Sequence, residues 1–183
     1  MTPLERLIAK ASTMHDTEKI ALVHRFFEDN IEWRPDLCEY SVAEYWATPA
    51  EVMERKAGDC EDIAIAKYFT LKEAGMTDDQ LKIVYGQICK EDTWVPHMVL
   101  MCHSWDGQII LDNVNNKIMP ENSRWDFISI LAFNLSGIWI FKNGHPKLIT
   151  TNCKRLKKWR ELIERYEMSK MCMRNFRYEG NGA

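Results

Sequence analysis

The chain reads Gly58-Asp59-Cys60-Glu61-Asp62 and continues with the alanine-rich apolar run Ile63-Ala64-Ile65-Ala66-Lys67-Tyr68-Phe69. This pattern predicts a largely buried helix that begins at Asp59 or Cys60 and ends near Ala74, with Gly75 as its stop. A helix N-terminus carries a partial positive charge and favours a thiolate at Cys60. The three carboxylates beside the cysteine oppose that thiolate by like-charge repulsion unless a cation lies among them. The pentapeptide therefore indicates a cysteine nucleophile and raises the question of a bound cation.

The remaining sequence predicts helices first, then a sheet, then a final helix. Helical spacing predicts a helix over 17–30 with Asp16 or Thr17 as its cap, and Thr48-Pro49-Ala50-Glu51 has the capping-box pattern of a second helix start. We expect strands over 81–89, 97–103, 108–114, 128–133 and 137–141, and a last helix from Asn152 onward. These elements predict an α+β fold in which the helix of Cys60 packs on an antiparallel sheet.

Composition narrows the classes of protein to which the chain can belong. Its 183 residues suffice for one domain, expected over 1–178, with a disordered tail over 179–183. The net charge of -3 gives no reason to expect a nucleic-acid partner, and the basic residues of 154–160 are interpreted as a solvated helix face. Six cysteines without a C-x-x-C pair argue against a disulfide scaffold and a structural zinc site.

The expected location follows from the absence of two sequence signals. Residues Met1–Leu7 lack the basic region, apolar core and cleavage site of an export signal. The longest apolar stretch, Ile128 to Phe141, contains Asn134 and is too short to cross a bilayer. We therefore expect no membrane insertion and, for the chain as written, a cytoplasmic location.

Two residues further along the chain are candidate partners for the cysteine. His97 begins one predicted strand and Asp112 ends the next, with the Asp-Gly turn at 104–107 between them. If these strands form a hairpin, position 114 lies opposite His97 and Asp112 is a diagonal neighbour on the same face. His97 then acts as the base and acid for Cys60, and the Asp112 carboxylate orients its imidazole.

Simpler structural roles compete with each of these assignments. A lone cysteine is commonly a small buried hydrophobe, and a histidine is commonly a satisfied core residue. Asp112 can cap its own backbone at the strand end. His103 is the rival histidine, on the same face of the same strand but at its far end. The shared face of His97 and Asp112 favours the catalytic interpretation.

The same motifs resemble those of a known family. The strings that carry the resemblance are Glu44-Tyr45-Trp46-Ala47-Thr48-Pro49-Ala50-Glu51, Gly58-Asp59-Cys60-Glu61-Asp62, His97-Met98-Val99-Leu100 and Leu111-Asp112-Asn113. Together they resemble the bacterial transglutaminase-like cysteine peptidases of the periplasmic adhesin-protease type, over about residues 17–166.

The resemblance implies a transglutaminase-like or papain-like cysteine protease core with Cys60, His97 and Asp112 as its triad. It also implies that Asp59, Glu61 and Asp62 bind calcium, which prefers hard oxygen ligands of this kind. The substrate implied is a protein, with a surface adhesin as the family example, and the compartment implied is the periplasm if a signal has been removed.

Three functions remain open from the sequence, which does not predict an oligomeric state. The first is a cysteine endopeptidase that hydrolyses a peptide bond through a thioester acyl-enzyme and is expected to depend on calcium. The second is transglutaminase-type acyl transfer or deamidation by the same triad. The third is a catalytically silent binding or adaptor module on the same fold.

Overall fold

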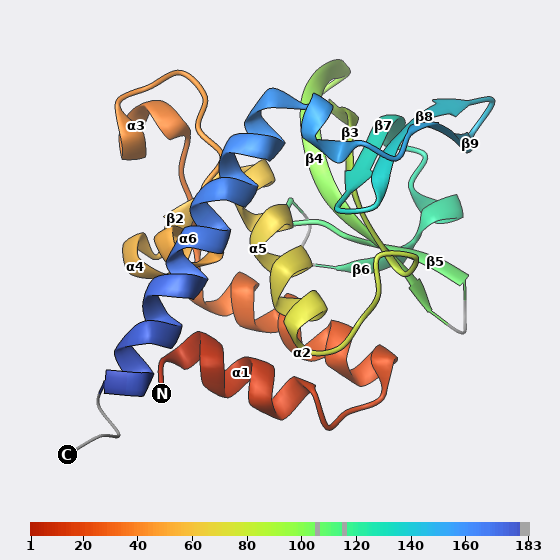
Figure 1. Cartoon of the computed structure of the whole chain (residues 1–183). Helices are drawn as coiled ribbons and strands as arrows, with labels where there is room; N and C mark the ends of the chain where they lie inside the picture. Colours follow the sequence, from red (N-terminus) through yellow and green to blue (C-terminus); the bar gives the residue numbers. More distant parts are fainter. Residues whose placement is uncertain (105–106, 115–116, 180–183) are drawn as a thin grey trace.

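The chain folds into helices that pack on one face of a large antiparallel sheet (Figure 1). The computed structural model describes the backbone of residues 1–104, 107–114 and 117–179. The helices are Pro3–Ala11 (α1), Asp16–Asn30 (α2), Asp36–Tyr40 (α3), Pro49–Arg55 (α4), Cys60–Glu73 (α5) and Lys157–Glu179 (α6), with 3-10 turns at Glu121–Ser123 (η1) and Cys153–Arg155 (η2). The strands are Glu32–Trp33 (β1), Ala57–Gly58 (β2), Leu81–Lys90 (β3), Thr93–Ser104 (β4), Gly107–Leu111 (β5), Ile118–Pro120 (β6), Phe127–Asn134 (β7), Gly137–Lys142 (β8) and His145–Thr150 (β9).

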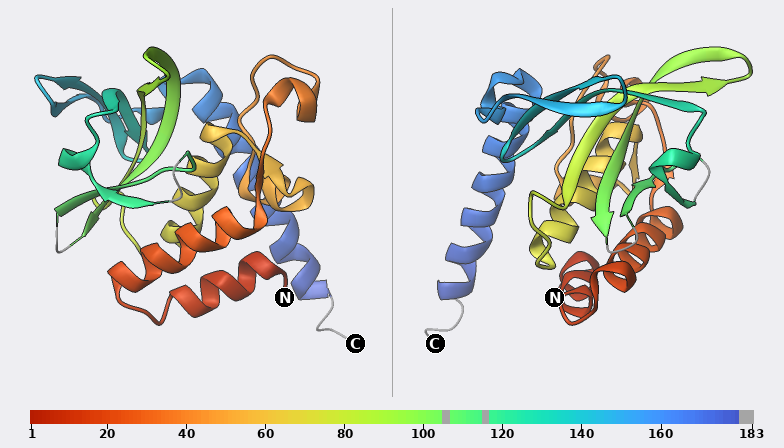
Figure 2. Two further views of the ribbon diagram at one scale, coloured as in Figure 1. Left: turned by 180° about the vertical axis from the view of Figure 1, so that it is seen from behind. Right: turned by 90° about the vertical axis from the view of Figure 1, so that its right-hand side faces the viewer.

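The main sheet has seven strands in the order β6-β5-β4-β3-β7-β8-β9, and every neighbouring pair is antiparallel. The β3–β4 hairpin projects beyond the body of the sheet (Figure 2). Its strands extend to Lys90 and Thr93, so the segment 89–96 before His97 is mostly strand. This arrangement agrees with the predicted α+β fold.

Helix α5 lies at the centre of the fold, between the sheet and the other helices. It packs on β4 and contacts α1, α2 and α4, while α6 crosses it in Figure 1 and stacks Trp159 on Phe69. Every residue from Asp62 to Leu71 is buried. Because α5 is covered on several sides, its sequence is apolar almost all round. The helix begins at Cys60 and is capped by Asp59, within the predicted bounds.

A short parallel bridge fixes the segment that leads to the cysteine. Strand β1 pairs with β2, with Trp33 opposite Gly58, immediately before the cap of α5. A Cβ added at Gly58 would lie 2.8 Å from the Cβ of Asp62. Only glycine therefore allows the backbone at position 58 to approach the first turn of α5 so closely.

The predicted pairing of β4 with β5 is confirmed. Leu100 lies opposite Leu111 and His103 opposite Gln108, which is the register expected from the hairpin. Residues 105–106 of the predicted turn lie outside the described residues. Strand β5 ends at Leu111, so Asp112 follows the strand directly.

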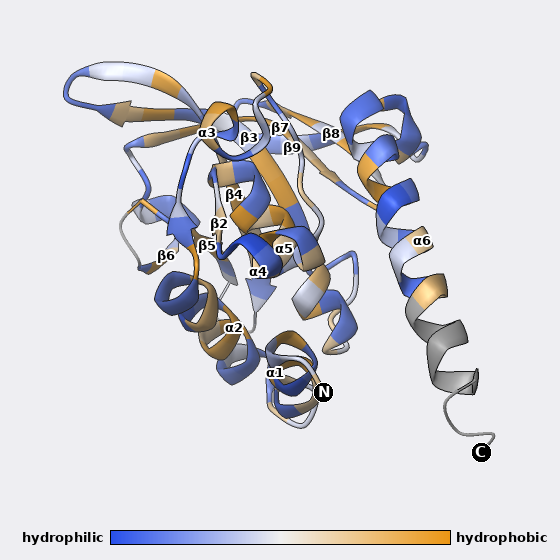
Figure 3. Ribbon diagram, turned by 90° about the vertical axis from the view of Figure 1, so that its left-hand side faces the viewer, coloured by the Kyte–Doolittle hydropathy of each residue, from blue (hydrophilic) through white to orange (hydrophobic). Residues whose placement is uncertain are grey.

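Hydrophobic residues occupy both faces of the sheet. The larger core lies between α5 and the sheet, where β4 runs through the interior in Figure 3. A smaller cluster on the other face includes Val84, Val99 and Phe127. No helix among the residues that the structure describes is long and apolar enough to cross a membrane.

Several elements differ from the sequence expectations. Helix α1, opened by a capping box at Thr2, and the short edge strands β6 and β9 were not predicted. Helix α2 begins at Asp16 with His15 in the cap position, so neither Asp16 nor Thr17 is its cap. The predicted tail begins inside α6, which runs to Glu179, and its remaining residues 180–183 lie outside the described part of the chain.

Candidate active site

Cys60 and His97 line one cleft between the start of α5 and the sheet. The cleft has a volume of about 440 Å³. Its apolar wall includes Trp46 and Phe133, whose rings stack with centroids 5.4 Å apart. Two acidic side chains, Glu44 and Glu61, also line it. The cleft thus combines a cysteine thiol, an imidazole and an apolar surface on which a peptide chain can lie.

His97 is bound to Asp112, as the predicted register requires. Its Nε2 lies 2.8 Å from Oδ1 of Asp112, and both side chains are buried. The edge of Phe127 meets the imidazole with ring centroids 6.2 Å apart. With Nε2 engaged by the carboxylate, Nδ1 is the ring nitrogen left to exchange a proton in the cleft.

The Asp112 carboxylate is held in its charged form. Burial by itself disfavours ionisation. The hydrogen bond and charge of His97 outweigh this effect and lower the pKa of Asp112 to about 2. The backbone N–H of Val114 donates to Oδ1 at 2.9 Å and acts in the same direction. The pair is therefore a buried carboxylate and an imidazole that it orients.

Arg124 completes this group and was not predicted from the sequence. Its Nη2 donates to Oδ2 of Asp112 at 2.8 Å, and its Nε donates to Oδ1 of Asp126 at 2.7 Å. The guanidinium is almost fully buried. Arg124 directly follows η1, and nothing local in the sequence distinguishes it from a surface arginine.

The Cys60 thiol is surrounded by acceptors and negative charge. Its Sγ donates to Oε2 of Glu61 at 3.0 Å. Burial raises the pKa of the Cys60 thiol well above its usual range, and the charge of Glu61 raises it further. A backbone hydrogen bond from Met98 opposes this shift. The acids therefore work against the thiolate that the helix end favours.

A cluster of buried and half-buried carboxylates lies beside the cysteine. Asp36, Asp59 and Asp62 bring carboxylate oxygens within 4.8 Å of one another, and Glu61 approaches Asp59 and Cys60 in the same way. Oδ1 of Asp36 and Oδ2 of Asp62 are buried without a hydrogen-bond partner. Burial, reinforced by repulsion between these acids, raises the pKa of Asp59 to about 9 and that of Asp62 to about 8.

This cluster fits a divalent cation with oxygen ligands. Unpartnered buried carboxylate oxygens are unfavourable, and a hard cation such as Ca²⁺ satisfies them. The structure places Asp59 close to Glu61 and close to Asp62, the three residues that the resemblance implies as ligands, and it adds Asp36 to the cluster. Asp36 is the first residue of α3, where an acid is common for helix-dipole reasons, so its sequence position carries no specific signal.

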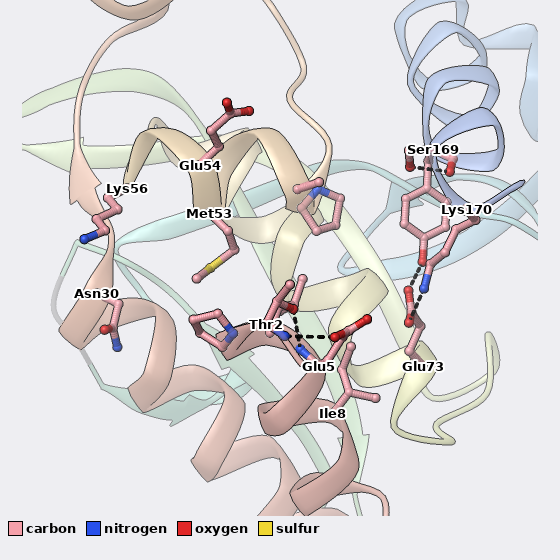
Figure 4. Close-up of a pocket in the computed structure, with 15 residues that line it drawn as sticks. Thr2, Glu5, Ile8, Asn30, Met53, Glu54, Lys56, Glu73, Ser169 and Lys170 are labelled. Atoms are coloured by element: carbon pink, nitrogen blue, oxygen red, sulfur yellow. Dashed lines mark hydrogen bonds and ion pairs between the residues drawn. The ribbon is translucent and has the colours of Figure 1, made fainter. Parts of the chain in front are cut away.

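The other histidines and cavities lie apart from this cleft. His103 lines a separate cavity with Asp79 and Gln108. A larger cavity of about 480 Å³ lies between α1, α4 and α6, where Met53 points inward and Glu73 accepts bonds from Tyr166 and Lys170 (Figure 4). Among the described residues that line it, none is a cysteine or a histidine.

Comparisons with known proteins agree with this geometry. A family model described as bacterial transglutaminase-like cysteine proteinase matches residues 5–145. Calcium-bound LapG from Legionella pneumophila is similar with 30% identity and a TM-score of 0.75, over 89% of this chain and 87% of that chain. EGTA-treated LapG from the same organism has 26% identity and a TM-score of 0.65, over 90% and 98% of the two chains. A search of curated protein sequences finds no significant match.

The family match covers most of the chain and includes Cys60, His97 and Asp112. The structural similarity extends over nearly the whole of both chains. The buried helix that begins at Cys60, the antiparallel sheet and the imidazole–carboxylate pair are thus found in a chain that the family model relates to cysteine proteinases and that is similar in structure to LapG. The chain belongs to the bacterial transglutaminase-like cysteine proteinases.

Proposed function

We propose that the protein is a cysteine endopeptidase in which Cys60 is the nucleophile, His97 the general base and acid, and Asp112 the residue that orients His97. One observation carries the proposal: Cys60 at the start of α5 and His97, already bound to Asp112, line the same cleft. A cysteine nucleophile is consistent with the cysteine-proteinase family to which the chain belongs.

The first step is formation of the nucleophile. The proton of the Cys60 thiol passes to Nδ1 of His97, and the Asp112 carboxylate stabilises the resulting imidazolium through Nε2. The thiolate then attacks the carbonyl carbon of the scissile peptide bond. The backbone N–H of Cys60, free at the helix N-terminus, donates to the oxyanion of the tetrahedral intermediate.

The second step breaks the peptide bond. The His97 imidazolium gives its proton to the leaving amine, and a thioester forms between Cys60 and the acyl part of the substrate. Water, deprotonated by His97, attacks the thioester and releases a carboxylate and the free thiol. If an amine replaces water, the same thioester gives acyl transfer, and this second outcome is open to test.

Calcium is the cofactor that the carboxylate cluster supports. Asp36, Asp59, Glu61 and Asp62 would hold it, and their two unpartnered buried oxygens are the observation in its favour. Bound calcium would supply the positive charge that offsets the repulsion between these acids and the Cys60 thiolate. LapG, a protein of similar structure, has been solved in a calcium-bound form and in an EGTA-treated form, which supports calcium as the cation to test here.

The proposed substrate is a protein, and the family resemblance extends the proposal to a surface adhesin in the periplasm. The test compares extracts of bacterial cells treated with wild type or with Cys60→Ala, each in calcium and in EGTA. Cys172→Ala is the matched control, because Cys172 is an exposed thiol outside the cleft. Peptide N-termini that appear only with wild type and Cys172→Ala, in calcium, would support the endopeptidase.

Other results would redirect the proposal. Incorporation of a labelled amine into substrate without new N-termini would replace hydrolysis by acyl transfer. Conversion of glutamine to glutamate would indicate deamidation. If wild type and Cys60→Ala give identical products in every condition, the chain is a binding module rather than an enzyme.

A further inference from the structure

A row of alternating charges extends from the imidazole into the protein. His97 binds Oδ1 of Asp112, Nη2 of Arg124 binds Oδ2 of Asp112, and Arg124 in turn binds Asp126 through Nε and Nη2. His97, Asp112 and Arg124 are each no more than 4% exposed. Asp126, at the outer end, is about a quarter exposed.

The two oxygens of Asp112 have separate tasks. Oδ1 accepts from His97 and from the backbone N–H of Val114, whereas Oδ2 accepts from Arg124. A carboxylate turns about its terminal torsion with little resistance. The bond to Oδ2 stops that rotation, so Oδ1 stays aimed at the imidazole. Without it, a buried oxygen would lack a partner, which is costly for a charged group.

Arginine suits this position better than lysine. The guanidinium is a rigid fork, and here one edge holds both oxygens of Asp126 while Nη2 also reaches Asp112. Its carbon Cζ lies 5.7 Å from the centroid of Phe127, the same ring whose edge meets His97. Arg124 is thus fixed by two contacts that are independent of Asp112.

Asp126 also balances the charge of the guanidinium. A lone buried cation would draw the negative charge of Asp112 away from the imidazole. Because Asp126 binds the same guanidinium at 2.7 and 3.0 Å, the pair Arg124–Asp126 is close to neutral. Asp112 can therefore direct its charge towards His97 while its geometry is held by Arg124.

We propose that Arg124, anchored by Asp126, is a positioning residue that fixes the Asp112 carboxylate and through it the imidazole of His97. This inference rests on the proposed function, because it assigns a role within the same Cys60–His97–Asp112 group. It adds a residue twelve positions from Asp112 that touches neither substrate nor nucleophile.

The test measures two quantities on the full chain in calcium. The first is kcat on a peptide that spans the cleavage site identified by the new N-termini, and the second is the rate of Cys60 alkylation by iodoacetamide. We expect Arg124→Ala to lower kcat roughly 10- to 100-fold, as loss of a charged buried hydrogen bond does, with little change in KM. Arg25→Ala is the control, because Arg25 is an exposed arginine that also pairs with an aspartate.

Chemical rescue separates positioning from a purely structural role. Millimolar guanidinium chloride is expected to restore part of the kcat of Arg124→Ala, whereas sodium chloride at equal ionic strength does not. If Arg124→Ala does not fold, Arg124→Lys decides, with an expected several-fold loss of kcat at unchanged Tm. The proposal would be overturned if either folded variant had the kcat of wild type. It would also be overturned if the activity of Arg124→Ala fell only in proportion to the amount of folded protein and guanidinium did not restore it.

Failure of the inference is distinguishable from failure of the proposed function. If His97→Ala and Asp112→Ala retain wild-type alkylation rates and cleavage, the proposed function itself is wrong. If both variants lose cleavage and slow alkylation while Arg124→Ala behaves like wild type, only the role of Arg124 is wrong.

Discussion

Asp62→Asn is expected to stabilise the calcium-free protein, although it alters a fully buried side chain close to Cys60. Asp62 is 0% exposed, its Oδ2 has no hydrogen-bond partner, and burial together with nearby acids raises its pKa to about 8. An asparagine keeps the oxygen that accepts from the Ala47 N–H at 2.7 Å. It removes the ionisable group, so that no proton has to be kept on a buried carboxyl, and it adds a permanent donor that faces Asp36 and Asp59.

The size of the stabilisation follows from the difference between the pKa values of Asp62 in the folded and unfolded chain. In the unfolded chain the pKa of Asp62 is near 3.8, so at pH 7 the folded protein must keep a proton on a carboxyl that would otherwise lose it. That requirement costs about 4 kcal/mol at pH 7. Because the pKa of Asp62 is higher in the folded protein than in the unfolded chain, its titration costs no stability below about pH 4. The folded state is progressively destabilised as the pH rises from there towards 8.

The assay is thermal unfolding followed by circular dichroism, in EGTA at pH 5 and pH 7. The Tm of wild type is expected to be lower at pH 7 than at pH 5. At pH 7, Asp62→Asn is expected to raise the Tm by roughly 10 °C. Asp79→Asn, an exposed acid outside the cluster, is the matched control. In calcium the order reverses, because the variant lacks one of the proposed ligands and gains less from the cation. An Asp62→Asn protein that is less stable than wild type in EGTA at pH 7 would refute the reasoning.

Three further predictions concern the cleft. Asp112→Asn leaves Arg124 without its buried anion and His97 without its carboxylate, so we expect kcat to fall about 100-fold or more. Because the pKa of Asp112 is lowered to about 2, wild type should also lose stability as the pH falls from 4 to 2. The variant lacks this contribution to stability and should not show that loss. Glu61→Gln should speed Cys60 alkylation in EGTA, since it removes the charge that raises the pKa of the thiol, and an unchanged rate would contradict this. Gly86→Ala, opposite His97 in the sheet, places a Cβ 2.2 Å from the Ile128 carbonyl oxygen and should cost about 1–3 kcal/mol of stability in urea unfolding.

The parts of the fold that were predicted have strong local signals. The α5 boundaries follow from a capping aspartate and a stop glycine at positive φ, and both are present. The β4–β5 register follows from a tight turn of fixed length. That register predicts His97 and Asp112 on one face of the sheet, and the structure shows the two side chains hydrogen-bonded. Strand β9 could not be predicted in the same way, because it is an edge strand with exposed side chains and Pro146, and it lacks the alternating pattern of a half-buried strand.

The site residues that were missed depend on tertiary structure alone. Asp36 reaches the carboxylate cluster because the loop after α3 returns to α5, where the Tyr45 N–H donates to its second oxygen. Arg124 is buried only because η1 carries it under the His97–Asp112 pair. Neither residue belongs to a motif of characteristic spacing, so a contact over 12 or more positions had to be seen in three dimensions.

Site-resolved alkylation of the cysteines is the most direct test of the central claim, that His97 activates Cys60 in the cleft. Mass spectrometry after brief iodoacetamide treatment in calcium compares half-buried Cys60 with Cys38, which is exposed. The account predicts that Cys60 reacts much faster than Cys38 in wild type and that His97→Ala abolishes this advantage. Burial alone predicts the reverse order, so slower labelling of Cys60 than of Cys38, or a Cys60 rate unaffected by His97→Ala, would contradict the account.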